Sequence, residues 1–139
     1  MRKILVAIDG SPREAKIVRA ARELAERAGA RLIFFRAVAL PVDLPRAAFA
    51  ISPDSVGELL LKEAQARVRA AIADVPPALV ADVRVGLGAP WQAICDEAKR
   101  DEVDLIAIGS HGYGGLDRLL GTTAAKVVNH ADRSVLVIK

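Results

Sequence analysis

Cysteine, aromatic residues and long apolar runs are all scarce in this sequence. A single cysteine among 139 residues cannot form a disulfide within the chain, which fits a reducing compartment. Aromatic residues make up 4% and apolar residues 53%, so small and aliphatic side chains must fill the interior. The apolar run at residues 4–8 is too short for a signal-peptide core, and no run reaches membrane-spanning length. We therefore expect a soluble, cytoplasmic protein.

Charge and histidine content argue against two further classes of protein. The formal net charge is +3, and the basic residues are spread along the chain without a Lys/Arg block or interleaved aromatic residues. A nucleic-acid-binding surface is therefore not indicated. The two histidines, His111 and His130, have no cysteine or acidic cluster at ligand spacing, which argues against a zinc site. The length suits a single domain over residues 1–139.

Short apolar runs alternate with segments of helical periodicity along the whole chain. We expect strands at residues 3–8, 31–38, 80–85, 104–108 and 134–138, and helices at 12–28, 53–73, 90–100 and 124–129. This alternation predicts a three-layer α/β domain with helices on both faces of a five-stranded parallel sheet, for which we take the strand order 3-2-1-4-5. Residues 80–85 alternate between apolar and polar, which predicts an edge strand.

Local signals mark where two of the helices begin and end. Ser11 followed by Pro12 and Glu14 predicts a capping box with Ser11 as the N-cap, and Gly29 is a natural C-terminal cap. Cys95 falls on the apolar stripe of the helix at 90–100, so we interpret it as a core residue rather than a nucleophile.

A glycine-rich loop at residues 109–115 carries the main chemical signal. It follows the strand at 104–108, and Gly121, Thr122 and Thr123 come just before the last helix. Glycines let a ligand approach the backbone, and a helix start offers unpaired N–H groups with a partial positive charge. The loop is neither a Walker A loop nor a Rossmann glycine fingerprint. It indicates a phosphate cradle, and the alternative is a tight surface connection that is rich in glycine.

Two polar strand ends are expected to meet near this loop. Asp9 ends the first strand and Gly109 ends the fourth, and the assumed strand order reverses between them, where ligands of such sheets bind. Phosphates would go to loop amides, the adenine to backbone groups near Ala37, and a ribose hydroxyl or a magnesium ion to Asp9. Alternatively, Asp9 caps the next helix. His111 could reach a phosphate or stabilise the turn, and we assign no catalytic base.

Three segments carry a resemblance to a known family: Ile-Leu-Val-Ala-Ile-Asp-Gly-Ser-Pro at residues 4–12, the loop at 109–122 and the strand at 134–138. Through them the whole chain resembles the universal stress protein family. The resemblance implies a Rossmann-like fold and, as in many members, ATP binding with magnesium. The family's ATP-binding pattern is G-x2-G-x9-G-[ST]. Gly109, Gly112, Gly121 and Thr122 fit it, except that eight residues rather than nine follow Gly112.

Carried over by position, the resemblance implies roles for individual residues and a mode of assembly. Asp9 would lie beside the ribose or adenine, Ala7 and Ala37 would contact the base through their backbones, and Ile108 would precede the first loop glycine. Members commonly dimerise through the last strand, so we expect a homodimer formed between Val135 and Ile138. The full set of expected nucleotide-binding residues is Ala7, Asp9, Ala37, Ile108, Gly109, His111, Gly112, Gly121, Thr122 and Thr123.

Three functions are compatible with these features. The leading hypothesis is an ATP-binding module of the stress response, with little or no turnover, that signals to an unknown partner. The second is a slow ATPase or autophosphorylating enzyme, for which Arg118 is the nearest arginine to the loop. The third is a dimeric scaffold that does not bind nucleotide.

Overall fold

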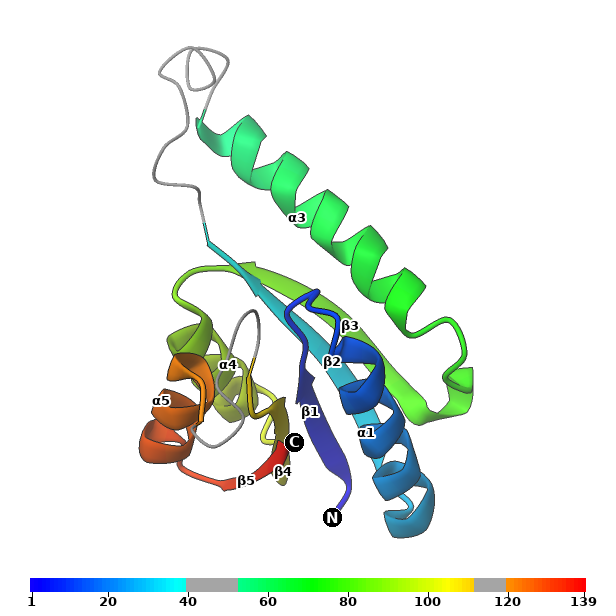
Figure 1. The fold of residues 1–139 in the computed structure, drawn as a ribbon. Coiled ribbons are helices and arrows are strands. Elements are labelled where there is room, and N and C mark those ends of the chain that lie inside the picture. Colours follow the sequence, from blue (N-terminus) through cyan, green and yellow to red (C-terminus); the bar gives the residue numbers. More distant parts are fainter. Residues whose placement is uncertain (40–52, 112–119) are drawn as a thin grey trace.

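The computed structural model describes residues 1–39, 53–111 and 120–139. Expectations for residues 112–119, Gly112 and Arg118 among them, lie outside this part of the chain. The described elements alternate along the chain (Figure 1). They are β1 (Lys3–Ala7), α1 (Glu14–Ala28), β2 (Arg31–Val38), α3 (Pro53–Ala71), a 3₁₀ turn (Pro77–Leu79), β3 (Val80–Leu87), α4 (Pro90–Arg100), β4 (Leu105–Gly109), α5 (Thr122–His130) and β5 (Ser134–Ile138).

The five strands form one parallel sheet in the order β3-β2-β1-β4-β5, as expected from the sequence. β1 lies at the centre, with its Val6 paired to Phe34 of β2 on one side and to Ala107 of β4 on the other. The strand order reverses between β1 and β4, because the chain extends the sheet first through β2 and β3 and then through β4 and β5. β3 is an edge strand, which confirms that part of the prediction, although it runs two residues further than expected, to Leu87.

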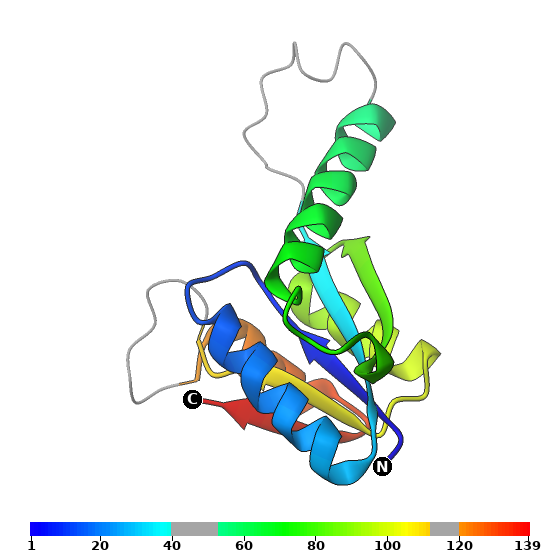
Figure 2. The same ribbon diagram turned by 90° about the vertical axis from the view of Figure 1, so that its right-hand side faces the viewer.

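Helices cover both faces of the sheet. In Figure 1, α1 and α3 lie to the right of the sheet and α4 and α5 to the left, and Figure 2 shows α1 in front of the sheet, running along the strands. Successive side chains of β1 point to opposite faces, so Ile4 and Val6 pack in the cluster under α1 and α3, whereas Leu5 packs under α4 and α5. The three-layer arrangement follows from this alternation, because each face of the central strands is apolar.

The start of α1 differs from the expected capping box. The helix begins at Glu14, and the Glu14 carboxylate accepts the N–H of Gly10 at 2.9 Å rather than that of Ser11. The Ser11 N–H instead donates to Oδ1 of Asp9 at 2.9 Å. The C-terminal cap is as expected: Gly29 adopts φ 64°, and its N–H donates to the carbonyl of Ala25.

An ion-pair network ties the edge strand β3 to α4. Arg84 of β3 donates to Asp82 at 2.7 Å, to Glu97 at 2.8 Å and to Asp101 at 2.5 Å, and Arg100 also pairs with Glu97. The three carboxylates together raise the pKa of Arg84 above its ordinary value, with Asp101 contributing most. Glu97 is buried although it carries charge, and Arg84 and Arg100 supply its partners.

Within the described part of the chain, no helix has both the length and the apolar character needed to cross a membrane. Cys95 is half-buried against the cluster under α4 and α5, and burial raises the pKa of its thiol, as does the charge of Asp96. The side chain therefore packs as expected from its apolar stripe, although it is not fully enclosed.

Candidate functional site

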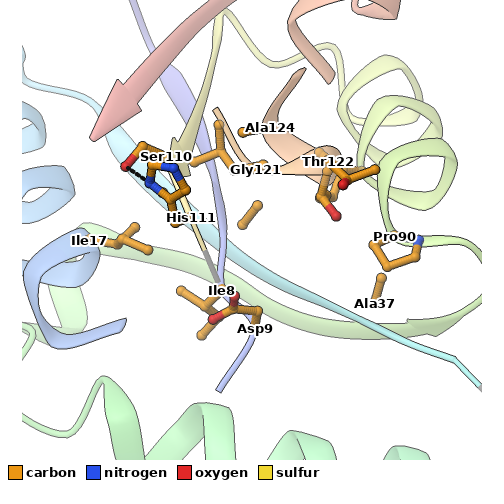
Figure 3. Close-up of a pocket in the computed structure, with 15 residues that line it drawn as sticks. Ile8, Asp9, Ile17, Ala37, Pro90, Ser110, His111, Gly121, Thr122 and Ala124 are labelled. Atoms are coloured by element: carbon orange, nitrogen blue, oxygen red, sulfur yellow. Dashed lines mark hydrogen bonds between the residues drawn. The ribbon is translucent and has the colours of Figure 1, made fainter. Parts of the chain in front are cut away.

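A cavity of about 480 Å³ opens at the carboxyl ends of the central strands, where the strand order reverses (Figure 3). The ends of β1, β2 and β4 contribute to its wall, together with the first turns of α4 and α5 and one side chain of α1. This is the place where open parallel α/β sheets bind ligands, because the loops diverge there and leave a crevice. Its described lining residues are Ala7, Ile8, Asp9, Ile17, Ala37, Pro90, Ile94, Ile108, Gly109, Ser110, His111, Gly121, Thr122, Thr123 and Ala124.

The structure gathers nine of the ten expected site residues around this cavity, and the tenth, Gly112, lies outside the described residues. Their role in binding a nucleotide stays a prediction. Sequence reasoning had not assigned six of the lining residues to the site: Ile8, Ile17, Pro90, Ile94, Ser110 and Ala124. Pro90 carried a usable signal, since it opens a helix directly after a strand end and all parallel strands end at the same edge of the sheet.

Asp9 lines the cavity and closes the turn that leads to α1, although it does not cap that helix, and its role toward a ligand stays a prediction. Its side chain is exposed on the wall of the cavity, and its Oδ1 accepts the Ser11 N–H two residues further on. The second oxygen of the carboxylate is left to accept a donor from a ligand. Asp9 supplies the one carboxylate side chain among the described lining residues. This carboxylate would accept a ribose hydroxyl or coordinate a cation.

Two glycines of the site lie where an added side chain would crowd its neighbours. A Cβ at Gly109 would lie 2.6 Å from Cδ1 of Ile17, and a Cβ at Gly121 would lie 3.2 Å from the carbonyl oxygen of Ser110. The Gly121 N–H donates to that same carbonyl at 2.7 Å, which joins the end of β4 to the start of α5. A side chain at Gly109 would displace the end of the Ile17 side chain, and one at Gly121 would crowd the backbone at Ser110, so either would change the shape of the cavity.

The first turn of α5 presents unpaired amides to the cavity. Gly121 is the N-cap of the helix and has no side-chain capping bond, and the intrahelical ladder starts with the Ala125 N–H donating to Gly121. The N–H groups of Thr122, Thr123 and Ala124 therefore have no acceptor within the helix. Together with the helix dipole and two threonine hydroxyls, they make a binding point for an anion. The helix forms here although the spacing after Gly112 is one residue short of the family pattern.

Ser110 and His111 form a buried polar pair at the end of β4. The Ser110 N–H donates to the carbonyl of Ile138 in β5 at 2.8 Å, and the Ser110 hydroxyl and Nδ1 of His111 are 3.0 Å apart. The imidazole is only 7% exposed, and its Nε2 has no hydrogen-bond partner among the residues that the structure describes. A buried nitrogen without a partner costs about 1–3 kcal/mol, so it marks a place where a ligand atom would be stabilised.

The cavity has two chemically different ends. Figure 3 shows Ala37 and Pro90 together at one end and Ile17, Ser110 and His111 at the opposite end, with Asp9 between them. Ala37 and the Pro90 ring give the first end apolar surface, with Thr122 of α5 nearby, whereas the second end holds the buried polar pair. A ligand with a flat apolar part and an anionic part fits this polarity.

Comparison with known proteins identifies the family of the chain. The model of the universal stress protein family matches residues 1–139 of the chain. The chain belongs to the universal stress protein family. A relative named universal stress protein A homolog 2, from Coxiella burnetii, is 31% identical over 99% of this chain and 94% of its own length. A universal stress protein from Thermus aquaticus is 33% identical over 98% of this chain and 97% of its own.

Solved structures of family members have the same fold. UspA from Lactobacillus plantarum is 27% identical and superposes with a TM-score of 0.81 over 99% of this chain and 97% of its own. A universal stress protein solved in complex with cAMP is 26% identical, with a TM-score of 0.60 over 99% of this chain and 95% of its own. These matches establish the Rossmann-like universal stress protein fold for the chain.

A magnesium ion would have to be held mainly by its ligand's phosphates. Among residues 1–39, 53–111 and 120–139, no three histidine, cysteine, aspartate or glutamate side chains gather where they could hold a metal ion. Magnesium commonly binds through one or two carboxylates plus substrate phosphates, so Asp9 and the Thr122 hydroxyl fit such a site only when a phosphorylated ligand is bound.

Proposed function

We propose that this chain is an adenine-nucleotide-binding universal stress protein, with ATP and magnesium as its ligands and with little or no turnover. The observation that carries the proposal is the cavity at the β1/β4 switch point, whose wall combines the unpaired amides of α5 with an apolar end. Its volume of about 480 Å³ falls within the usual range for small-molecule and cofactor sites.

The phosphates would lie against the start of α5. The N–H groups of Thr122, Thr123 and Ala124 and the hydroxyls of the two threonines can donate to phosphate oxygens. Gly121 lets the phosphates approach the backbone because it has no side chain at the entry to the helix. The partial positive charge of the helix start favours a group that carries several negative charges.

The adenine would occupy the apolar end of the cavity. Ala7 and Ala37 have methyl side chains, so a flat ring can reach their backbone groups, while Pro90 and Ile94 supply apolar surface from α4. In Figure 3, Asp9 lies between Ala37 and Ile17, and its carboxylate would accept the hydroxyls of a ribose.

Little turnover is expected because the site lacks an arranged catalytic group among the described residues. The Ser110 hydroxyl and Nδ1 of His111 are hydrogen-bonded, but no described carboxylate contacts Nε2, so the pair has no acid to orient and activate the imidazole. A bound nucleotide would then act by ordering the cavity wall, and the readout would be a change in surface or assembly.

The complex of a family member with cAMP supports a purine nucleotide as the ligand class, since that protein shares the fold at 26% identity. Two features of this chain also support a nucleotide ligand: the polarity of the cavity and the Nε2 of His111, which has no described partner. We further propose a homodimer formed through β5, an edge strand whose Val135 and Ile138 are only half-buried in the single chain.

Nucleotide titration tests the binding proposal. Isothermal titration calorimetry with adenosine and with Mg-ATP is expected to show binding of both to the native sequence, with Mg-ATP the tighter ligand because of its phosphates. Replacing Asp9 by alanine should weaken both ligands by about tenfold, because each loses a charge-assisted hydrogen bond from the ribose. Asp9→Asn keeps an acceptor for the Ser11 N–H and should also weaken both ligands, which separates the ribose contact from the folding of the turn.

Glu23→Ala provides the matched control, since it removes the same charge from an exposed position on α1 that does not line the cavity. It should leave both affinities unchanged. Absence of any binding heat or thermal shift with millimolar Mg-ATP would reject the proposed function. Equal losses in the Asp9 variants and in the control would remove Asp9 from the site.

A further inference from the structure

A second cavity adjoins the polar end of the first. It measures about 290 Å³ and lies between the first turn of α1 and the end of β5. It shares Ile17 and residues 109–111 with the first cavity, so the end of β4 forms a common wall between the two. The shared wall is the end of the first cavity that holds the buried pair of Ser110 and His111.

The lining of this second cavity is basic. Arg13, Lys16 and Lys139 contribute to it, and none of its described lining residues has a carboxylate side chain. None of the salt bridges between described residues involves these three cations, whereas Arg84 and Arg133 are both paired. Three basic residues therefore line one concave surface whose described lining holds no carboxylate side chain, and such a surface attracts a small anion.

His111 supplies the second, independent observation. His111 lines both cavities, its side chain is buried, and its Nε2 has no described partner. If the Ser110 hydroxyl donates to Nδ1, the ring proton resides on Nε2, and Nε2 is then a donor without a described acceptor. A phosphate oxygen would satisfy it and would select this tautomer.

We propose that the second cavity binds a phosphate group, through Arg13, Lys16 and Nε2 of His111. The group comes from one of two sources: the terminal phosphates of a nucleotide seated in the first cavity, or a separate phosphate ion. The first source rests on the proposed function, and the second stands without it. In either case the site adds anion selectivity beside the neutral amides of α5.

The test compares a double variant with a control of equal charge. Arg13→Gln/Lys16→Gln removes two cations of the second cavity, and Arg19→Gln/Arg27→Gln removes two exposed cations of the same helix that line neither cavity. Calorimetric titrations at fixed salt use tripolyphosphate, AMP and ATP with each protein. We expect the cavity variant to bind tripolyphosphate about tenfold more weakly, since each exposed cation contributes modestly, while the control binds as the native protein does.

The ATP and AMP titrations identify the source. Weaker ATP binding with unchanged AMP binding means that the cavity takes the nucleotide's terminal phosphates, whereas unchanged affinity for both nucleotides means that it takes a separate phosphate. Equal losses of tripolyphosphate binding in the two double variants, or no loss in either, would overturn the proposal. A native protein that binds tripolyphosphate but no nucleotide would contradict the proposed function and would still support the phosphate site.

His111→Phe gives a second measurement, because it keeps a ring in the buried position and removes Nε2. With folding verified by circular dichroism, the variant should bind tripolyphosphate more weakly than the native protein does. If this variant does not fold, the charge variants alone decide the proposal. A folded His111→Phe protein with native affinity would remove His111 from the site.

Discussion

Gly109 illustrates how a single residue shapes the cavity. It ends β4 beside the first turn of α1, and no positive φ is involved, so its lack of a side chain matters because of space. A Cβ there would meet the Cδ1 of Ile17 at 2.6 Å, in a wall that both cavities share. The residue therefore decides how closely α1 approaches the site.

Gly109→Ala should lower the free energy of unfolding by about 2 kcal/mol, because the new methyl group overlaps Ile17. Ile17→Val removes Cδ1 and should cost about 1 kcal/mol by itself. The double variant should be less destabilised than the sum of the two, which denaturant unfolding of all four proteins measures as a coupling energy. Strict additivity would show that the contact with Ile17 is not what requires glycine.

At the scale of elements, the connection between β3 and α4 depends on charge rather than apolar packing. Arg84 joins the strand to Glu97 and Asp101 of the helix region, and the Glu97 side chain is only 7% exposed. Partial burial opposes ionisation of Asp82, but hydrogen bonds from Arg84 and from the Val83 N–H outweigh it and lower the pKa of that carboxyl group. An edge strand with few buried residues gains a specific partner in this way.

Arg84→Gln should destabilise the protein by about 2 kcal/mol, because it leaves the buried Glu97 with Arg100 as its remaining partner. This value is smaller than that for a fully buried ion pair because Arg84 is partly exposed. Arg67→Gln is the matched control: it breaks an exposed ion pair with Glu63 on α3 and should cost less than about 0.5 kcal/mol. Urea unfolding followed by circular dichroism gives both values. Similar small losses in the two variants would mean that the network contributes no more than a surface pair.

For the whole molecule, the exposed edge of the sheet at β5 bears on assembly. β5 pairs with β4 on one side only, and its apolar residue Leu136 is 37% exposed. Unpaired N–H and C=O groups on such a strand favour pairing with a second chain. A dimer formed there would lie near the second cavity, whose lining includes Ile138 and Lys139.

Leu136→Asp should convert a dimer into a monomer, since it places a charge at the centre of the proposed interface. Light scattering after size-exclusion chromatography should then give a mass near 14.8 kDa instead of about twice that value. Leu59→Asp changes a more exposed leucine on α3 and should leave the dimer intact. A native protein that elutes as a monomer at all concentrations would contradict the proposed assembly.

The spacing of residues along the chain determined most of the elements. Apolar runs such as Leu32 to Phe35 predicted buried strands, Gly29 predicted the end of α1, and the alternation in residues 80–85 predicted the edge position of β3. These features depend on local backbone preferences and on periodicity, which a sequence displays directly. The position of the site was predictable for the same reason, because parallel strands bring Asp9 and Gly109 to one edge.

Tertiary packing alone decided the partners of individual side chains. The sequence could not reveal that Glu14 accepts from Gly10, that Arg84 reaches Glu97, or that Nε2 of His111 is buried without a described partner. Such contacts join residues through the exact placement of helices on the sheet, which no local preference encodes. The second, basic cavity belongs to the same category, because it exists only where the first turn of α1 meets the end of β5.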